Sequence, residues 1–111
     1  MAVVPERVLH EAARRFALLS DPTRLRLVSA LHEAGEATVG EIAAATGASL
    51  PNVSQHLARL ADGGIVARRR DGRSVRYWIA DPTIEGLCRI VCDALGARER
   101  NDEEVAAVRA R

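Results

Sequence analysis

Apolar residues in the first third of the chain recur at helical spacing and predict two amphipathic helices. The first is expected to run from Pro5 to about Ser20. The second is expected to start at the Asp21-Pro22 pair, because aspartate is a good N-cap and proline fits the first helical turn. Gly35 is the expected end of this second helix.

Two shorter helices are predicted next, separated by a tight turn. The segment from Thr38 to Glu41 matches a capping box, in which the two side chains satisfy free amides at a helix start. This third helix is expected to stop at Gly47, and Ser49 is expected to open a fourth helix that runs to Ala61. Two helices joined by so short a turn have the helix-turn-helix shape.

The periodicity then changes from helical to alternating, which predicts a hairpin followed by a fifth helix. One strand is expected from Ile65 to Arg70, followed by an Asp-Gly pair at 71–72 as the centre of a type I′ turn. The returning strand carries alternating apolar residues at 75, 77 and 79. The fifth helix is expected to begin at the Asp81-Pro82 pair and to lose its apolar stripe from about residue 98. That stripe consists of Ile84, Leu87, Cys88, Val91 and Leu95.

Composition restricts the class of protein. With 111 residues the chain fits one compact domain, and 48% hydrophobic residues suffice for a core. No apolar run approaches the roughly 20 residues that span a bilayer, so no membrane segment is expected. The N-terminal segment lacks the apolar region of a secretory signal, and two cysteines are too few for a disulfide framework. We therefore expect a cytoplasmic protein with reduced thiols.

The basic charge is concentrated in one segment. The net charge is only +1, and all 16 basic residues are arginine. From residue 59 to residue 76, six arginines stand against two aspartates, which gives this segment a net charge of +4. A local basic surface is what contact with DNA requires, although a solvated charged hairpin would show the same pattern.

The fourth predicted helix divides into an apolar and a polar face. Val53, Leu57 and Leu60 share the side that faces the core. The opposite side, which has no carboxylate, consists of Asn52, Gln55, His56 and Arg59. Asn and Gln pair with adenine and Arg with guanine in the major groove, and the hydroxyls of Ser49 and Ser54 suit phosphate oxygens. These six residues are candidates for DNA contact, and an ordinary polar helix face is the alternative.

The predicted hairpin adds a second candidate contact element. Its arginines are Arg68, Arg69, Arg70, Arg73 and Arg76. A basic hairpin beside a recognition helix forms a wing, which reaches along the phosphate backbone or into the minor groove.

Three motifs, DPTRLR (21–26), NVSQHLARL (52–60) and RRRDGRSVRY (68–77), resemble those of the ArsR/SmtB family of bacterial winged helix-turn-helix regulators. The resemblance extends from about residue 14 to residue 95. It implies a mainly α-helical fold with a small β-hairpin wing, ordered as four helices, two strands and a fifth helix. It also implies a homodimer through the first and fifth helices that binds an inverted-repeat operator, usually as a repressor released by an inducer. Residues 1–97 are then the DNA-binding and dimerisation domain, and residues 98–111 are a polar tail.

Members of this family often sense metal ions, but neither familiar metal site is intact in this chain. Thr38 and Gly40 stand where the site on the third helix has cysteines. Of the zinc ligands on the fifth helix only Asp81 is present. The other ligand positions hold Thr83, Ala94 and Ala97. A transition metal ion such as nickel or zinc therefore needs other ligands.

Two other sets of residues are candidates for these ligands. Cys88 and Cys92 share one helix face at i and i+4, so their thiolates could hold a soft ion such as Zn(II), Cd(II) or As(III), with further ligands from the other subunit. They could also form a redox or sulfur switch, or pack as small apolar residues. His10 and His32 are the second candidate set. The family resemblance places His10, which is beside Glu11, near the fifth helix of the partner subunit, where an imidazole with a carboxylate such as Asp93 suits Ni(II), Zn(II) or Co(II). Ordinary surface histidines are the alternative.

The remaining alternatives concern the class of function. The helical pattern brings together no catalytic triad, and the chain has no phosphate-binding glycine loop or metalloprotease motif, so no enzyme is expected. A winged adaptor that no longer binds DNA is disfavoured by the polar face of the fourth helix and by the arginine-rich hairpin. Besides the cysteine pair and the histidines, a third possibility is that this chain only binds DNA and that a partner protein senses the effector.

Overall fold

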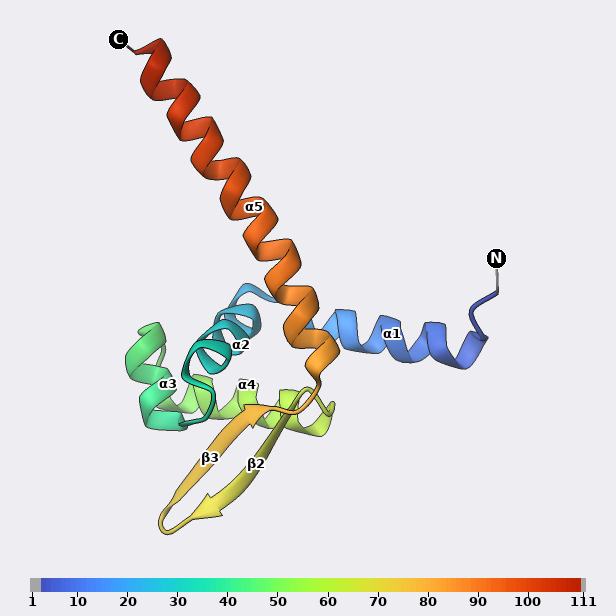
Figure 1. The fold of residues 1–111 in the computed structure, drawn as a ribbon. Coiled ribbons are helices and arrows are strands. Elements are labelled where there is room, and N and C mark those ends of the chain that lie inside the picture. The colour runs from blue at the N-terminus through green and yellow to red at the C-terminus, as the bar shows by residue number, and fades with distance from the viewer. Residues whose placement is uncertain (1–2, 111) are drawn as a thin grey trace.

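The computed structural model describes residues 3–110, which form five helices and a small antiparallel sheet (Figure 1). The elements in chain order are α1 (Glu6–Leu19), α2 (Pro22–Ala34), β1 (Ala37–Thr38), α3 (Val39–Thr46), α4 (Leu50–Asp62), β2 (Val66–Asp71), β3 (Ser74–Ile79) and α5 (Pro82–Arg109). The body is built from α2, α3 and α4, and the β2–β3 hairpin projects from it. This arrangement confirms the expected winged helix-turn-helix architecture.

Residues close together in sequence set the ends of the two short helices. At the start of α3, the Thr38 hydroxyl accepts from the Glu41 amide at 3.2 Å, and the Glu41 carboxylate accepts from the Thr38 amide at 3.3 Å. Gly47, with a left-handed φ of +74°, ends α3. The Ser49 hydroxyl then caps α4 by accepting from the Asn52 amide at 3.3 Å. The predicted capping box and the tight connection between α3 and α4 are therefore confirmed.

The hairpin turn lies one residue later than the pattern predicts. Asp71 is the last residue of β2 and pairs with Ser74, so the two turn residues are Gly72 and Arg73. Gly72 has a φ of +62°, whereas no non-glycine residue in the described chain has a positive φ. A positive φ at the first central position alone is the pattern of a type II′ turn, so the expected type I′ turn is wrong. The shift places Arg73 in the turn itself.

A third strand is missing from the sequence prediction because it is only two residues long. β1 pairs antiparallel with β3, with Ala37 opposite Tyr77 and Thr38 opposite Arg76, and the strand order is β1-β3-β2. Two residues are too few to show an alternating pattern, so only the tertiary structure reveals this strand. β1 connects the hairpin to the start of α3, because Thr38 is also the N-cap of that helix.

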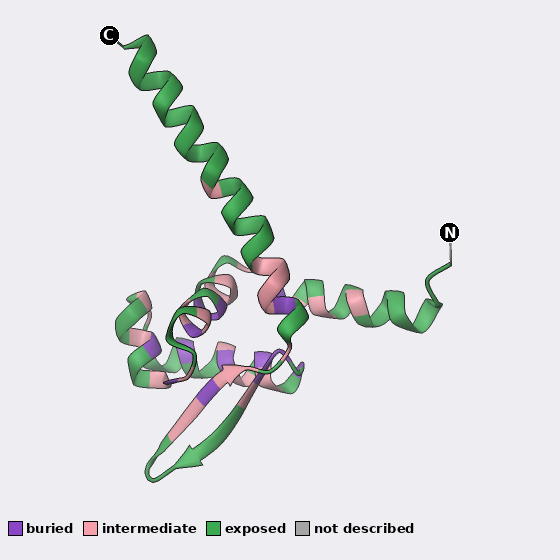
Figure 2. Cartoon of the chain, viewed as in Figure 1, coloured by how far each residue is buried: buried purple, intermediate pink, exposed green. Residues whose placement is uncertain are grey.

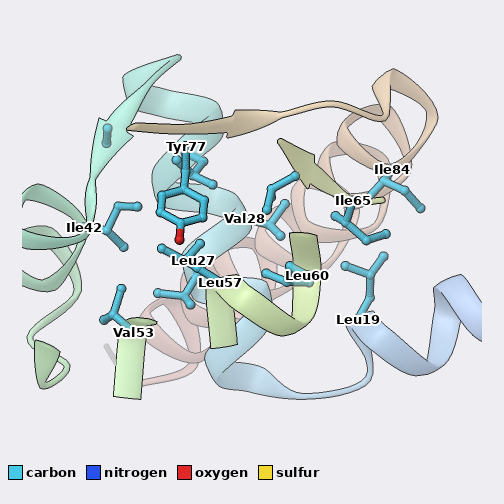
Figure 3. Packing of buried hydrophobic residues seen from close by; sticks show 13 residues of the cluster. Leu19, Leu27, Val28, Ile42, Val53, Leu57, Leu60, Ile65, Tyr77 and Ile84 are labelled. Atoms are coloured by element: carbon cyan, nitrogen blue, oxygen red, sulfur yellow. The ribbon is translucent and has the colours of Figure 1, made fainter. Parts of the chain in front are cut away.

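The core is almost entirely aliphatic and lies between α2, α3, α4 and the sheet (Figure 3). Its fully buried large side chains are Leu27, Val28, Leu31, Ile42, Val53, Leu57, Leu60 and Ile65. Tyr77 of β3 turns its ring into the same cluster. α1 and α5 each contribute one buried residue to this core, Leu19 at the end of α1 and Ile84 near the start of α5.

Most of α1 and α5 is exposed in the single chain (Figure 2). Phe16 of α1 is 55% exposed, and Ile90 and Leu95 of α5 are 71% and 56% exposed. α5 continues as one helix through the residues expected to form a polar tail, and residues 98–110 are all exposed. Within residues 3–110, no helix carries an apolar stretch long enough to cross a membrane.

An ion pair joins α1 to the start of α5. Asp81 is the N-cap of α5, and its carboxylate accepts from the Thr83 hydroxyl at 2.5 Å and from the Thr83 amide at 3.0 Å. The guanidinium of Arg15 on α1 pairs with the other oxygen of this carboxylate. The Thr83 hydroxyl above all, then the Thr83 amide and the charge of Arg15, lower the pKa of Asp81 against the opposing effect of burial. Asp81 therefore stabilises the fold as a charged group.

Asp81→Ala is expected to lower the free energy of unfolding by about 0.5–2 kcal/mol, because α5 loses its N-cap and Arg15 loses its partner. Asp81→Asn is the matched control, because it keeps a capping oxygen and removes the charge, so its loss is expected to be smaller. Urea unfolding at equal protein concentration measures both differences. Equal stability of Asp81→Ala and the wild type at neutral pH would contradict this role.

The same residue predicts how stability depends on pH. Since the pKa of Asp81 is lowered in the folded chain, its ionic contribution is present above the ordinary aspartate pKa. That contribution is lost as the pH falls through the lowered pKa of Asp81. The stability gap between the wild type and Asp81→Asn is therefore expected to shrink in acid.

Candidate nucleic-acid interface and cysteine pair

The polar face of α4 is exposed. Val53, Leu57 and Leu60 are fully buried, which turns the opposite side of the helix to solvent. The predicted DNA-contact residues on or beside that side that are exposed are Ser49, Asn52, Ser54, Gln55 and Arg59. Arg59 takes part in none of the ion pairs within residues 3–110. The structure thus presents amide, hydroxyl and guanidinium groups together on one exposed helix. The expectation that this face has no carboxylate is wrong, because α4 continues to Asp62, which lies beside Gln55 and Arg59.

His56 lies at the edge of this face and is only partly exposed. Its side chain is 22% exposed, and its Nδ1 lies 3.7 Å from the carboxylate of Asp21. Asp21 is the N-cap of α2, where its carboxylate also accepts from the Thr23 amide at 3.4 Å. His56 therefore connects α4 to the first turn of α2, a contact that helical spacing alone does not reveal.

Two of the five hairpin arginines share one face of the sheet and are held by carboxylates. Arg69 and Arg76 lie opposite each other in the β2–β3 register. Arg69 donates to both carboxylate oxygens of Glu36, at 2.5 and 2.8 Å, and its guanidinium lies 5.5 Å from the ring centre of Trp78. The hydrogen bonds to Glu36 are the main cause that raises the pKa of Arg69. The positive charge of Arg69 is therefore compensated within the chain.

Arg76 is surrounded by three carboxylates. Its Nε donates to Asp71 at 2.7 Å and lies 3.8 Å from Glu36, while its Nη1 lies 3.6 Å from Glu41. Because Glu41 belongs to the capping box of α3, this cluster connects the hairpin to the start of that helix. Arg76 therefore helps to hold the hairpin against the body.

The other three hairpin arginines have no carboxylate partner at ion-pair distance among residues 3–110, although Tyr77 and the charge of Asp62 raise the pKa of Arg68. Arg68, Arg70 and Arg73 are exposed and form none of the ion pairs found between residues 3 and 110. Arg68 and Arg70 alternate with Arg69 along β2 and so lie on the other face of the hairpin, while Arg73 is in the turn. These three side chains are the hairpin cations most available to a phosphate backbone.

Four of the five predicted metal ligands lie around one space between α2 and α5. This α2–α5 hollow has a volume of about 240 Å³ and is lined by His32, Glu85, Cys88, Cys92 and Asp93, together with neighbouring residues of both helices. The fifth predicted ligand, His10, does not line the hollow. Its side chain is 78% exposed on α1 and lies 3.4 Å from Glu6. The structure thus separates His10 from the other four candidates.

Glu85 is a residue of the hollow that the sequence pattern did not single out. Its carboxylate contacts Nδ1 of His32 across the space between α5 and α2. Glu85 precedes Cys88 by three residues and Cys92 by seven, a spacing that puts all three on one side of a helix. This spacing could have identified Glu85 once the cysteines were considered.

The two cysteines are free thiols in different surroundings. Cys88 is half-buried against the core, and Cys92 is exposed. Burial, and then the nearby Cys92, raises the pKa of Cys88 above that of a free thiol.

The single chain contains no preformed metal site among its described residues. From residue 3 to residue 110, no three His, Cys, Asp or Glu side chains are placed to hold one ion together. Asp81, the one ligand left of the zinc pattern on the fifth helix, instead caps α5 and pairs with Arg15. Asp81 therefore has a structural role in this chain.

The chain is similar to known transcription regulators. A family model described as a helix-turn-helix domain matches residues 19–69. The probable mercury resistance operon repressor of Streptomyces lividans is 45% identical over 75 residues, which cover 68% of this chain and 59% of that repressor. The chain thus spans about three fifths of the length of this curated relative.

Two solved structures share the fold over nearly their whole length. The antimony-specific transcriptional repressor AntR is 31% identical with a TM-score of 0.83, and 90% of each chain is covered. The homodimeric winged helix-turn-helix DNA-binding domain of Mb0332 from Mycobacterium bovis, a possible ArsR-family transcriptional regulator, is 32% identical with a TM-score of 0.75. That match covers 91% of this chain and 95% of the Mb0332 domain. These similarities confirm the predicted fold.

Proposed function

The chain belongs to the ArsR/SmtB family of winged helix-turn-helix regulators, and we propose that it represses transcription by binding operator DNA as a homodimer. The observation that carries this proposal is the exposed polar face of α4, whose carboxylate, Asp62, stands at the C-terminal end of the helix, and which packs beside the basic hairpin. A helix with free amide and guanidinium groups suits the major groove, and a basic wing suits the adjacent backbone.

Asn52, Gln55 and Arg59 are the proposed base-reading residues. Each is exposed on α4 and can form two parallel hydrogen bonds to one base edge. The hydroxyls of Ser49 and Ser54, near the N-terminus of the same helix, are proposed to contact phosphate oxygens, where the helix dipole adds to the attraction. His56 is proposed to contact DNA from the edge of the face while its Nδ1 stays near Asp21.

Gln55→Ala is expected to weaken binding to the cognate operator by about 1–3 kcal/mol and to relax base preference, because the variant cannot form the bidentate hydrogen bonds to a base. Fluorescence anisotropy on operator DNA and on random DNA of equal length measures the two affinities. Asn101→Ala, an exposed amide on the distal part of α5, is the matched control and is expected to leave both affinities unchanged. An equal loss on operator and random DNA would contradict base reading by Gln55.

The hairpin is proposed to bind the phosphate backbone chiefly through Arg68, Arg70 and Arg73. Arg69 and Arg76 are also predicted contacts, but each must share its charge with carboxylates of the same chain. Phosphate contact by these two is therefore expected to contribute less than contact by the other three.

Arg73→Ala is expected to weaken binding to operator and random DNA alike, because a phosphate contact carries no base information. The log–log dependence of affinity on salt is expected to flatten by about 0.9 for each phosphate that the variant no longer neutralises. Arg14→Ala removes the same charge from α1, where Arg14 pairs with Glu11 at 2.6 Å, and serves as the control. An unchanged salt slope for Arg73→Ala would exclude a phosphate role for this residue.

Homodimerisation is proposed to cover the exposed apolar residues of α1 and α5. Phe16, Ile90 and Leu95 are large apolar side chains that are more than half exposed in the single chain. They lie on the two helices that extend from the body (Figure 2). The similar Mb0332 domain is homodimeric. A two-fold dimer presents two α4 helices to two half-sites, so an inverted-repeat operator is expected.

Ile90→Glu is expected to convert the dimer largely to monomer, because the substitution places a charge in the proposed apolar interface. Sedimentation velocity at several protein concentrations measures the mass in solution. Ala44→Glu, on the exposed side of α3, adds the same charge outside the interface and is expected to leave the dimer intact. A fully dimeric Ile90→Glu protein would contradict an interface at this position.

We further propose that an effector controls DNA binding, with a transition metal ion as the first candidate. This choice is supported by two similar proteins, one described as a mercury resistance operon repressor and the other as an antimony-specific repressor. Redox or sulfur chemistry at Cys88 and Cys92, or sensing by a partner protein, is the alternative.

A further inference from the structure

We infer that Leu50, at the N-terminal tip of α4, recognises the C5-methyl group of a thymine in the major groove of the operator. The inference rests on the proposed function, because it assigns a further specificity-determining residue to the DNA face of α4. Three observations carry it. Leu50 is exposed, it lies beyond the edge of the core, and the first turn of α4 offers few free backbone donors.

Leu50 is an exposed aliphatic side chain on a helix whose other leucines are buried. Its exposed fraction is 56%, whereas Leu57 and Leu60 of the same helix are 0% exposed. Leu50 precedes Val53 by three residues and Leu57 by seven, so it continues their apolar stripe toward the start of the helix. The stripe therefore runs past the edge of the core by one helical turn, and its first member is left in water.

This exposed turn is the end of α4 that meets the bases when a helix-turn-helix protein binds DNA. In that geometry the N-terminal residues of the recognition helix contact base edges. Leu50 is the first residue of α4, and it lies between Ser49, which is proposed to contact phosphate, and Asn52, which is proposed to read a base. Leu50 is thus continuous with the proposed DNA face, so we assign operator DNA as the partner that covers its side chain.

The first turn of α4 has fewer free amides than the helix starts that bind phosphate through their backbone. Pro51 has no N–H, and the Asn52 amide already donates to the Ser49 hydroxyl at 3.3 Å. The Val53 amide donates to the Ser49 carbonyl at 3.0 Å. Pro51 is also exposed. Phosphate contact at this tip is therefore left to the hydroxyl of Ser49, while Leu50 and Pro51 give the tip an apolar surface.

The chemistry of the major groove selects the group that such a side chain can recognise. The polar groups on the base edges need hydrogen-bond donors or acceptors, and the leucine side chain has neither. The apolar group that a base pair displays in this groove is the C5-methyl of thymine. Contact between this methyl and Leu50 removes apolar surface of both from water, which favours binding. Leu50 is therefore expected to favour thymine at one position of each half-site.

The contact is tested on DNA that differs by the methyl group alone. The full wild-type chain first selects its operator from a pool of random-sequence duplexes. That operator is then synthesised with single thymines replaced by deoxyuridine, which keeps the hydrogen-bonding groups of the base and lacks only the methyl. Fluorescence anisotropy is expected to show an affinity loss of about fourfold at one position of each half-site, the loss expected for one methyl-sized apolar group.

Leu50→Ala tests the side chain. This variant is expected to bind the thymine and the deoxyuridine operators equally, because alanine is too short to reach the methyl group. Leu50→Met is the matched control, because it keeps an apolar side chain of similar volume, and it is expected to keep the preference for thymine. The dependence of affinity on salt is expected to be the same for both variants and the wild type, since no phosphate contact is lost. Circular dichroism of each variant checks that it is folded.

Gln55→Ala separates the methyl contact from hydrogen-bonded base reading. It is expected to weaken binding to both operators and to keep their ratio at the position read by Leu50. Equal affinity for thymine and deoxyuridine at every position of the operator would overturn the inference, and so would a preference for thymine that survives in Leu50→Ala. Both results leave sequence-selective binding, and with it the proposed function, intact. Failure of the pool to yield any preferred sequence would instead refute the proposed function and the inference together.

Discussion

The packing of α4 against α2 determines the orientation of the groups proposed to bind DNA. Val53, Leu57 and Leu60 of α4 are fully buried with Leu27 and Leu31 of α2 in one cluster. Since these three residues of α4 recur every three or four positions, their burial leaves the opposite face of the helix in water. The polar residues of α4 are thus oriented by the core beneath them, and disruption of that core would misplace them all together.

The hairpin arginines fall into two groups, one that forms ion pairs within the chain and one that is proposed to bind DNA. Arg69 and Arg76 pair with Glu36, Asp71 and Glu41, and the pairs with Glu36 and Glu41 connect the hairpin to the bend before β1 and to α3. Exposed ion pairs of this kind contribute little free energy individually, but they limit the directions the hairpin can take. The remaining hairpin arginines keep their charge for a partner. A count of arginines along the sequence cannot distinguish these two roles.

α1 and α5 are mostly exposed, whereas the helices of the body pack around the core. Each contributes one buried residue to the core, and both extend away from it with apolar side chains in water (Figure 1). The Arg15–Asp81 ion pair sets how α1 meets the start of α5, and the His32–Glu85 contact sets how α2 meets α5. The same region therefore combines the proposed dimer surface with the α2–α5 hollow.

The sequence by itself determined the features that depend on neighbouring residues. The capping box at Thr38 and Glu41, the glycine end of α3 and the polar face of α4 were all predictable, because each rests on contacts within one or two helical turns. The hairpin was predictable too, but its turn was misplaced by one residue, since strand register depends on cross-strand pairing.

Only the tertiary structure decided which groups meet across the fold. Glu36 and Arg69 are 33 residues apart in sequence, and His32 and Glu85 are 53 apart. Core packing and the directions of the helices bring such residues together. A helical or alternating pattern relates only residues a few positions apart, so it cannot predict these contacts. For the same reason the place of Glu85 beside His32 at the α2–α5 hollow follows from the fold alone, as does the exposure of His10 on α1.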